Sequence, residues 1–297
     1  MRFLLLGGTG QVGREFLALD LPKDIEVVAP SPSELDLMNV AAITNVIAAS
    51  PWNAVINAAA YTNVDRAESE QAAVFVINSE APAKLASETA RRGIPMIHIS
   101  TDYVFDGRKQ APYVETDATA PLNVYGKSKL AGEQGVAASN PRHVILRTSW
   151  VYSPYGHNFV KTILRLAGER ERLTIVADQR GCPTAARDVA KACFDIALVC
   201  ASQPQRAPYG IYHYAGAGET TWFGFAKAIV EMASTHFKRL PQIVPITTAE
   251  YSTAAIRPLD TRLDCHAITR NFGIAVRPWR KALGETLDQL LPARHLS

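Results

Sequence analysis

The stretch Phe3-Leu4-Leu5-Leu6-Gly7-Gly8-Thr9-Gly10-Gln11-Val12-Gly13 decides the fold of this chain. A continuous apolar run before a glycine cluster is typical of a strand buried on both faces of a parallel sheet. The apolar residues that follow the glycines have helical spacing. Glycines at such a strand-to-helix turn let the backbone approach a pyrophosphate, while the N–H groups of the helix face the anion. Gly7, Gly10 and Gly13 therefore predict a dinucleotide-binding loop rather than a simple turn.

Strands and helices alternate along the first half of the chain, which predicts an α/β fold with a doubly wound parallel Rossmann sheet. After Trp150 the alternation breaks down, and the remaining elements predict a smaller C-terminal α/β substrate-binding lobe. We expect residues 1–150, with about 171–215, to form the dinucleotide-binding domain. Residues at about 151–170 and 216–297 would then form the substrate-binding lobe.

The tip of the second predicted strand bears on the choice of cofactor. An acidic residue often holds the ribose 2′-hydroxyl of NAD(H) at this position. Here Pro30 and Ser31 follow the strand, and Glu34 and Asp36 come later. Without a carboxylate at the tip, a 2′-phosphate is not repelled, and Ser31 could donate a hydrogen bond to it, although no arginine stands beside it. The pattern favours NADPH, with NADH also usable, and makes Ser31, Asp36 and Leu37 candidate cofactor-binding residues.

Tyr125 and Lys129 are four residues apart in a segment with a helical pattern, so they would share one face of that helix. An ammonium group beside a phenol favours the phenolate and lowers the phenol's pKa toward neutral pH. Such a pair can pass a proton to or from a carbonyl oxygen. Thr101 follows a predicted strand, at the edge of the sheet where ligands bind. The three side chains would therefore converge beside the nicotinamide. The alternative is an exposed helix on which a Tyr and a Lys happen to be four residues apart.

Other polar and small residues have simpler interpretations. The small residues at 58–60 would let the backbone approach the nicotinamide half of the cofactor, or else form a close helix–sheet contact. Asp65, Glu68 and Glu70 are interpreted as a solvated helix face with no assigned role. His213 is interpreted as a packed histidine because no carboxylate partner is evident for catalysis.

Composition narrows the class of protein. The 297 residues carry a formal charge of +3 with acids and bases interspersed, so no basic stripe indicates nucleic-acid binding. No apolar run is long enough to span a bilayer. The four cysteines show neither a C-x-x-C pair nor a metal-ligand spacing, which predicts reduced thiols, no metal site of that kind and a cytoplasmic location.

With these motifs in view, the chain resembles the extended short-chain dehydrogenase/reductase superfamily and, more closely, the dTDP-4-dehydrorhamnose reductase family. The glycine loop and Tyr-x-x-x-Lys indicate only the superfamily. Two longer runs are more specific: Ser100-Thr101-Asp102-Tyr103-Val104-Phe105 and Arg147-Thr148-Ser149-Trp150-Val151-Tyr152. Further matching segments lie at residues 57–65, 115–117, 121–129, 178–184, 257–258 and 262–263.

The resemblance implies reduction of the C4 keto group of dTDP-4-dehydro-L-rhamnose, with Tyr125 as proton donor, Lys129 as its partner and ribose ligand, and Thr101 as third member. Other implied sites are Gly10, Gln11 and Val12 at the pyrophosphate, Ala60, Tyr61 and Thr62 at the nicotinamide, and Thr101, Asp102 and Trp150 at the sugar nucleotide. A dTDP-sugar carries two phosphates, so we expect Arg257 to point into the cleft and bind them, with Arg262 close behind it; a solvated loop arginine is the alternative.

The resemblance leaves oligomeric state and metal open. Some members dimerise through a magnesium ion held by glutamates; Glu15 matches one of them, but Arg187 stands where another would be, so a monomer and a homodimer are both compatible. Two other functions stay open. A nucleotide-sugar dehydratase or epimerase is one, although Tyr103 rather than Glu follows Asp102. A non-catalytic dinucleotide-binding subunit is the other. The sequence does not fix the stereochemistry of the product at C4.

Overall fold

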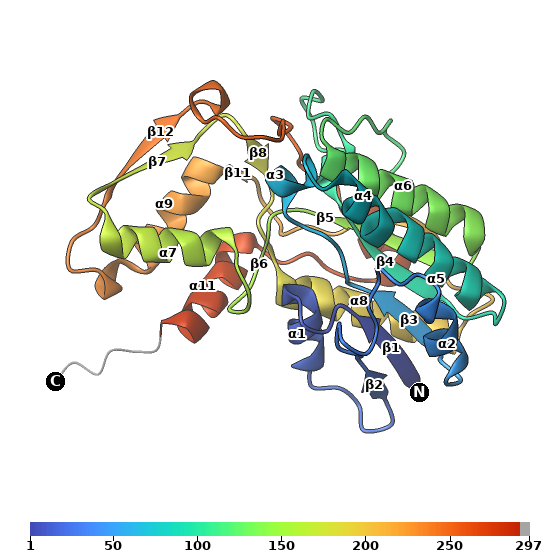
Figure 1. The fold of residues 1–297 in the computed structure, drawn as a ribbon. Helices are drawn as coiled ribbons and strands as arrows, with labels where there is room; N and C mark the ends of the chain where they lie inside the picture. The colour runs from blue at the N-terminus through green and yellow to red at the C-terminus, as the bar shows by residue number, and fades with distance from the viewer. Residues whose placement is uncertain (292–297) are drawn as a thin grey trace.

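The computed structural model describes residues 1–291 and is organised around a six-stranded sheet in which every neighbouring pair of strands is parallel. The strand order is β10-β5-β4-β3-β1-β2. The strands are β1 (Arg2–Leu6), β2 (Glu26–Val28), β3 (Ala54–Asn57), β4 (Met96–Thr101), β5 (His143–Thr148) and β10 (Gly210–His213). This arrangement, visible at the right of Figure 1, confirms the predicted doubly wound Rossmann sheet.

Both faces of the sheet are buried, because successive side chains of a strand point to opposite faces. Phe3 and Leu5 of β1 lie in one apolar cluster, and Leu4 and Leu6 lie in another. Each cluster is closed by its own helices. The first contains side chains of α1 (Gln11–Leu17), α8 (Ala186–Ser202) and α10 (His266–Phe272), and the second those of α2 (Ala42–Ala48), α5 (Ala81–Ala90) and α6 (Val124–Ser139).

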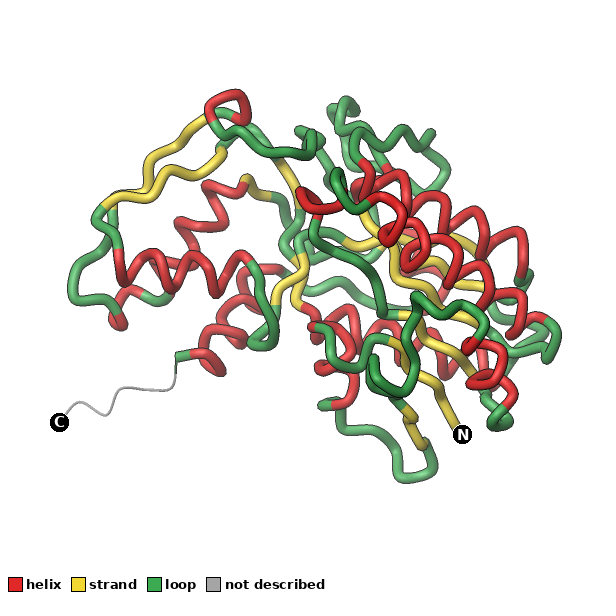
Figure 2. Tube along the Cα trace, viewed as in Figure 1, coloured by secondary structure: helices red, strands yellow, loops and turns green. Residues whose placement is uncertain are grey.

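A second lobe lies beside the sheet, at the left of Figures 1 and 2. Its core is one apolar cluster in which Trp279, Leu283 and Leu287 are buried, as their helical spacing predicts. The elements of this lobe are α7 (Phe159–Glu169), β7 (Arg172–Val176), α9 (Trp222–Met232), β12 (Gln242–Ile246) and α11 (Trp279–Leu290). Two short strand pairs complete it: β6 (Val151–Tyr152) with β9 (Thr184–Ala185), and β8 (Arg180–Gly181) with β11 (Thr220–Thr221). The remaining helical segments, in both parts of the molecule, are short. They are α3 (Val64–Ala67), α4 (Gln71–Phe75), a π-helical turn (Val76–Glu80) and 3-10 turns at Asp102–Val104, Ser234–His236 and Thr248–Glu250.

The division of the chain between the lobes differs from the expected one at four elements: β7, β8, β9 and α10. The short strands β8 and β9 pair with β11 and β6 of the second lobe. β7 pairs with β12 and not with the six-stranded sheet, so residues from about 171 to 176 lie in the second lobe. α10 packs against β10 and α8, so it lies with the sheet. All four segments are short, and their local sequence does not specify which lobe buries them. We therefore propose that the dinucleotide-binding domain includes α8, β10 and α10, and that β7, β8 and β9 belong to the substrate-binding lobe.

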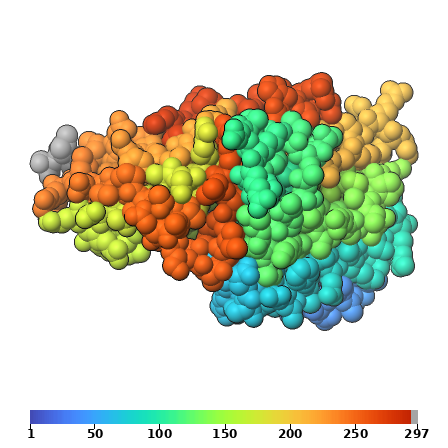
Figure 3. Space-filling view, turned by 90° about the horizontal axis from the view of Figure 1, so that it is seen from above, coloured from blue at the N-terminus to red at the C-terminus, as the bar shows by residue number. Residues whose placement is uncertain are grey.

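Ion pairs and hydrogen bonds join the two halves of the chain where they meet in Figure 3. Arg257 donates to both carboxylate oxygens of Asp65, at 3.0 and 2.7 Å. Glu68 accepts from the backbone N–H of Val124 at the start of α6, and Glu70 accepts from the hydroxyl of Tyr61. Asp65, Glu68 and Glu70 are partly exposed, as a solvated face would be, but each has a hydrogen-bond partner. The interpretation that they have no role is therefore wrong.

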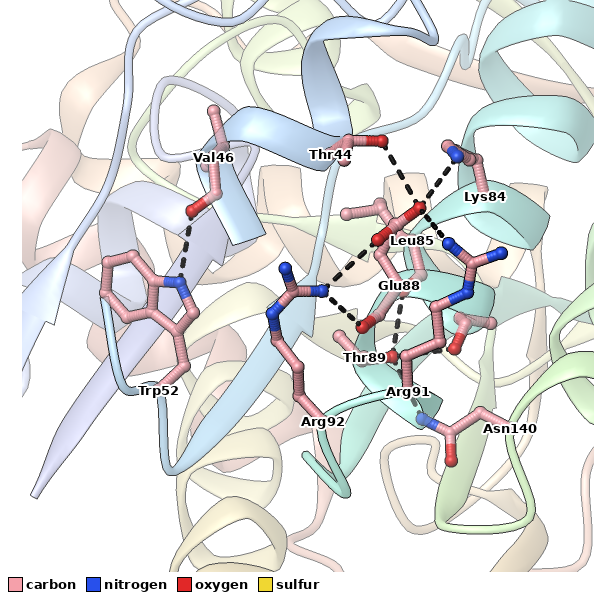
Figure 4. Close-up of polar contacts among 11 residues, drawn as sticks. Thr44, Val46, Trp52, Lys84, Leu85, Glu88, Thr89, Arg91, Arg92 and Asn140 are labelled. Atoms are coloured by element: carbon pink, nitrogen blue, oxygen red, sulfur yellow. Dashed lines mark hydrogen bonds and ion pairs between the residues drawn. The ribbon is translucent and has the colours of Figure 1, made fainter. Parts of the chain in front are cut away.

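Glu88 of α5 is a buried carboxylate, 1% exposed, at the centre of a polar cluster (Figure 4). It accepts from Lys84 at 2.7 Å and from Arg92 at 3.2 Å, and Thr44 of α2 donates to it at 3.2 Å. The Lys84 and Arg92 partners lower the pKa of Glu88. The cationic side chains that cover the carboxylate are themselves one-third or more exposed, so this site lies just below the surface.

Replacing Glu88 by Ala should lower the free energy of unfolding by about 2–3 kcal/mol at neutral pH, because a covered, charge-assisted hydrogen-bond centre between α2 and α5 is lost. Urea unfolding followed by circular dichroism measures the change. Glu169→Ala is the matched control: it removes an i,i+4 ion pair to Arg165 that is about half exposed, and it should change stability by under about 0.5 kcal/mol. Equal effects of the two substitutions would contradict the assignment.

Candidate active site

A cavity of about 790 Å³ opens at the carboxyl ends of β1, β3 and β4 and extends to the second lobe. Parallel strands deliver their following loops to the same edge, which is where ligands bind in such sheets. Its volume lies in the upper part of the range of ligand sites. Its walls include most of the predicted site residues: Gly7, Gly10, Gln11, Val12, Asp36, Leu37, Ala60, Thr62, Thr101, Asp102, Tyr125, Lys129 and Trp150.

The glycine loop forms one end of this cavity. Gly7 has a φ of +82°, and a Cβ there would lie 2.6 Å from the backbone of Ala58. Gly13 does not line the cavity; a Cβ there would lie 2.1 Å from the carbonyl oxygen of Gly7. Gly13 thus allows α1 to pack closely on β1. No side chain caps the start of α1, which leaves its first N–H groups directed at the cavity as donors for an anion.

Thr101, Tyr125 and Lys129 line the same cavity, as the sequence predicts. Thr101 ends β4, and its hydroxyl donates to Asp102 at 3.1 Å. Tyr125 lies in the first turn of α6, which begins there because the side chain of Asn123 accepts from the N–H of Gly126 at 2.8 Å. The carbonyl of Ile256 in turn accepts from Asn123. Helix α6 is therefore held at its N-cap residue by a loop of the C-terminal half.

The protonation of Tyr125 differs from the expected one. Burial raises the pKa of its phenol to about 12, while the neighbouring Thr101 hydroxyl lowers it in part. Burial outweighs the lowering that was predicted from Lys129, whose amine donates to the carbonyl of Ile99 at 2.7 Å and contacts His98 at 3.4 Å. Tyr125 is consequently a protonated phenol at neutral pH, which is the form that an acid catalyst needs.

Lys129 is almost completely buried, and burial lowers its pKa to about 8. Glu133, one turn further along α6, partly opposes that shift. Glu133 is itself held by the guanidinium of Arg147 on β5, at 2.9 and 2.7 Å. The lysine therefore gains and loses its proton near physiological pH rather than near its usual value of about 10.

Asp102 is also buried, and burial raises the pKa of its carboxyl to about 7, although the hydroxyls of Thr261 and Thr101 lower it in part. Trp150 lies opposite, on the side of the second lobe. Its backbone has a φ of +48°, and its ring stacks on Trp222 with centroids 3.6 Å apart. Gly181 makes room for this ring, because a Cβ at Gly181 would lie 2.5 Å from it. The two indoles form a flat apolar wall.

Four predicted site residues besides Gly13 do not line the cavity: Tyr61, Arg257, Arg262 and Ser31. The Tyr61 hydroxyl donates to Glu70, and its ring packs against the cluster of Ala67, Val74 and Val124. Arg257 is held by Asp65, so its guanidinium is engaged by protein rather than free in the cleft. Arg262 is likewise paired, with Asp260 and Glu219.

The hydroxyl of Ser31 is not free either: it contacts Ser33 at 2.9 Å and donates to Glu34 at 2.8 Å. The backbone N–H of Ser31 donates to the same carboxylate at 2.7 Å. Glu34 therefore folds back onto the tip of β2, and the expectation that no carboxylate stands there is wrong. The sequence did not predict this contact, because it depends on a turn that brings the Glu34 side chain back to Ser31.

The structure also brings residues into the cavity that the sequence did not single out, chiefly Trp222, Ser149, His157 and Asn158. The Asn158 amide donates to Gln11 of the glycine loop at 2.9 Å and so connects the two lobes. A Gly-His-Asn run before a helix carries a capping signal, since Asn158 caps α7, but nothing local points it at a cofactor loop. Trp222 has no sequence signal at all.

His213 is packed as predicted: it is fully buried, and its Nδ1 contacts the carbonyl of Tyr113 at 3.0 Å. All four cysteines are free thiols. Across residues 1–291 no group of three or more His, Cys, Asp or Glu side chains is placed to hold a metal ion. Glu15 is buried near Arg187, whose charge lowers the pKa that burial raises. No helix in the described part of the chain is long and apolar enough to cross a membrane.

The raised pKa of Asp102 predicts a pH-dependent effect of Asp102→Asn on stability. Between about pH 4 and 7 the unfolded chain has lost the proton that the folded protein keeps, so folding of the native chain weakens as pH rises through this window. The amide lacks this penalty. Its stability relative to the native chain should therefore rise across the window, by on the order of 3–4 kcal/mol. Urea unfolding at pH 4.5, 6 and 8 measures the trend, and a pH-independent difference would contradict the buried carboxyl.

Comparison with known proteins places this geometry in a family. Residues 1–291 match the family model described as the RmlD substrate binding domain. The dTDP-4-dehydrorhamnose reductase of Sinorhizobium fredii is 43% identical over 291 residues, covering 98% of each chain. That of Burkholderia thailandensis is 44% identical over 298 residues, covering 98% of this chain and 99% of the relative.

A solved structure extends the match to three dimensions. The dTDP-4-dehydrorhamnose reductase of Bacillus anthracis, in complex with NADP, is 34% identical with a TM-score of 0.90 and covers 97% of this chain and 99% of its own. The similarity therefore includes both lobes rather than the sheet alone. On the full-length match and these identities, this chain belongs to the dTDP-4-dehydrorhamnose reductase family.

Proposed function

We propose that this protein reduces the C4 keto group of dTDP-4-dehydro-L-rhamnose to give dTDP-L-rhamnose, with NADPH as the hydride donor. The observation that carries the proposal is the placement of Thr101, Tyr125 and Lys129 on one cavity with an uncapped glycine loop. Family membership at more than 40% identity over nearly the whole chain supports the substrate. The NADP complex of the Bacillus anthracis relative supports the cofactor.

The residues present fit a dinucleotide. The free N–H groups at the start of α1 suit a pyrophosphate, and Ala60 and Thr62 present little side-chain bulk where a flat ring would lie. Bound NADPH would supply the hydride to the carbonyl carbon. In our proposal Thr101 orients the carbonyl oxygen, and Tyr125 donates its phenolic proton as negative charge develops there. A phenol with a pKa of about 12 is still more acidic than an alcohol, so the transfer is favourable.

Lys129, in its protonated form, would stabilise the phenolate that Tyr125 leaves behind and would bind the nicotinamide ribose. Asp102 and the Trp150–Trp222 wall would contact the sugar nucleotide. Gly7, Gly10, Gln11, Val12, Asp36 and Leu37 would contact the cofactor. Arg257, Ser31 and Tyr61 stay predictions as ligand contacts; Arg257 would have to exchange Asp65 for a phosphate to act as one.

Two further parts of the proposal are coarser. The four free thiols fit a reducing compartment, and we propose a cytoplasmic location. We propose that the protein acts as a monomer or a homodimer without nucleic acid.

One relative carries the name of a different ketosugar reductase, so the substrate has to be tested directly. A Streptomyces antibioticus relative, 35% identical over 297 residues, is named as a probable 4-ketoreductase of another dTDP-ketosugar. The proposal therefore needs a substrate panel: NADPH oxidation followed at 340 nm with several dTDP-4-ketosugars, and product identification by NMR for the configuration at C4. Slow or absent turnover of dTDP-4-dehydro-L-rhamnose, with rapid turnover of another member, would reassign the substrate.

Tyr125→Phe removes the proposed acid without removing the ring. We expect kcat to fall by at least about 100-fold, since positioned proton transfer contributes about 10²–10⁴ in rate. The dissociation constant for NADPH, measured by fluorescence, should stay within about twofold. Tyr209→Phe is the matched control, because the Tyr209 hydroxyl donates to the carbonyl of Pro204 and Tyr209 does not line the cavity. Native turnover in the Tyr125 variant would exclude the proton-donor role.

Glu34→Gln tests the carboxylate at the tip of β2. Removing a negative charge near the expected 2′-phosphate should raise the ratio of kcat/KM for NADPH to that for NADH about fivefold, while glutamine can still accept from Ser31. The control Glu231→Gln changes the net charge equally in the other lobe. An unchanged cofactor ratio would show that the 2′-phosphate lies elsewhere.

A further inference from the structure

A buried polar chain leads away from Lys129, and its other two members, Asn57 and His98, have no role in the reaction as described so far. It joins Asn57 at the end of β3, His98 on β4 and Lys129 on α6, each no more than 1% exposed. Asn57 and His98 are direct neighbours in the register of the two strands. The Asn57 side-chain nitrogen lies 3.1 Å from Nδ1 of His98, and Nε2 of the same ring lies 3.4 Å from the Lys129 nitrogen.

The orientation of the Asn57 amide is fixed by the backbone. Its oxygen accepts from the N–H of Ala59 at 3.1 Å, so its NH₂ group must face His98. An amide NH₂ can donate but not accept. Nδ1 of His98 is therefore the acceptor and carries no proton. A flipped amide would place NH₂ against the N–H of Ala59 and lose that bond.

The protonation of His98 then follows. Burial, and next the charge of Lys129, lower the pKa of His98 well below its usual value, so the ring is neutral. A neutral imidazole has one N–H, and with Nδ1 accepting, that proton is on Nε2. The Nε2–H group points at the Lys129 nitrogen. A neutral amine has a lone pair that can accept it and can still donate to Ile99, whereas an ammonium group has no lone pair and would face a donor.

We propose that Asn57 and His98 are positioning residues that fix the ring tautomer facing Lys129 and thereby set the pH above which Lys129 gives up its proton. The inference rests on the proposed function, in which protonated Lys129 supports Tyr125. It predicts that the alkaline limb of the kcat–pH profile depends on a residue, Asn57, that touches neither Lys129 nor Tyr125.

The other charged and titratable groups around Asn57, His98 and Lys129 are the same in every variant proposed below. Glu133 on α6 raises the pKa of Lys129 and is itself bound to Arg147 on β5. Asp102 acts on Tyr125 from the end of β4. Because none of these is changed, a shift of the limb reports the Asn57–His98 pair.

Asn57→Asp reverses the tautomer. One carboxylate oxygen still accepts from Ala59, but the other can only accept, so Nδ1 of His98 must carry the proton and the Nε2 lone pair faces Lys129. The ammonium form gains an acceptor and a nearby negative charge. We expect the alkaline limb to move upward by at least about one pH unit, so that the fraction of optimal kcat retained at pH 9 rises at least about fivefold above that of the native protein. A merely structural role would lower kcat at all pH values and leave the limb in place.

The matched control is Asn53→Asp, at the opposite end of β3, where the side chain only accepts from the N–H of Arg2. It should leave the limb unmoved. His98→Gln is a second variant, in case Asn57→Asp folds poorly: its amide can turn an oxygen toward Lys129, and the limb should again move upward. Unfolding by urea at pH 7 checks that each variant is folded.

Two NMR measurements decide the inference without activity, so its failure is distinguishable from failure of the proposed function. Long-range ¹H–¹⁵N spectra of the intact protein, assigned with His98→Gln, should show His98 as the Nε2–H tautomer in the native chain and as Nδ1–H in Asn57→Asp. The ¹³Cε shift of Lys129 should titrate at higher pH in Asn57→Asp. A native Nδ1–H tautomer, or identical Lys129 titrations in the two proteins, would overturn it.

Discussion

The close approach of α1 to the ends of β1 and β3 is the constraint on which the site depends. At Gly7 and Gly13 a single added carbon would overlap backbone atoms of Ala58 or of Gly7 itself. Because no side chain separates these segments, the start of α1 is brought down onto the sheet, with its N–H groups directed along the same edge that presents Thr101. The floor of the cavity is therefore made of backbone, and its chemistry is supplied by the side chains of β4 and α6 above it.

What the sequence predicted well was set by periodicity and by short-range chemistry. The buried strands, the glycine turn and the convergence of Thr101, Tyr125 and Lys129 all follow from patterns within about ten residues plus the rule that parallel strands end at one edge. The residues of a short strand do not by themselves determine which sheet the strand joins. β7 reads as an apolar strand like the others, yet it pairs with β12 in the second lobe.

Electrostatics was the harder part to predict, because it depends on partners distant in sequence. From the sequence alone, Asp65 is interpreted as an exposed acid on a helix and Arg257 as a phosphate ligand. The structure pairs the two side chains, and nothing in their local sequence indicates this. Lys129 was expected to act on its neighbour in the helix, but the carbonyl of Ile99 and the ring of His98 lie closer to its amine. Family resemblance named the reactive side chains correctly as cavity residues. It did not describe the protonation of any of them, which burial largely determines.

The order of the elements along the chain has a consequence for biosynthesis. The first part of the second lobe, from β6 to β9, lies between β5 and β10 in the chain, and the rest of the lobe follows β10. Helix α8, which packs with Phe3, Leu5 and Phe16, comes directly after that first part. While the ribosome is still making residues 150 to 200, five strands are already available, but α1 is the only one of the three helices that cover one of their apolar faces to have been completed. Nascent chains of this length should thus recruit chaperones, and that demand should end once Ser202 has emerged from the exit tunnel.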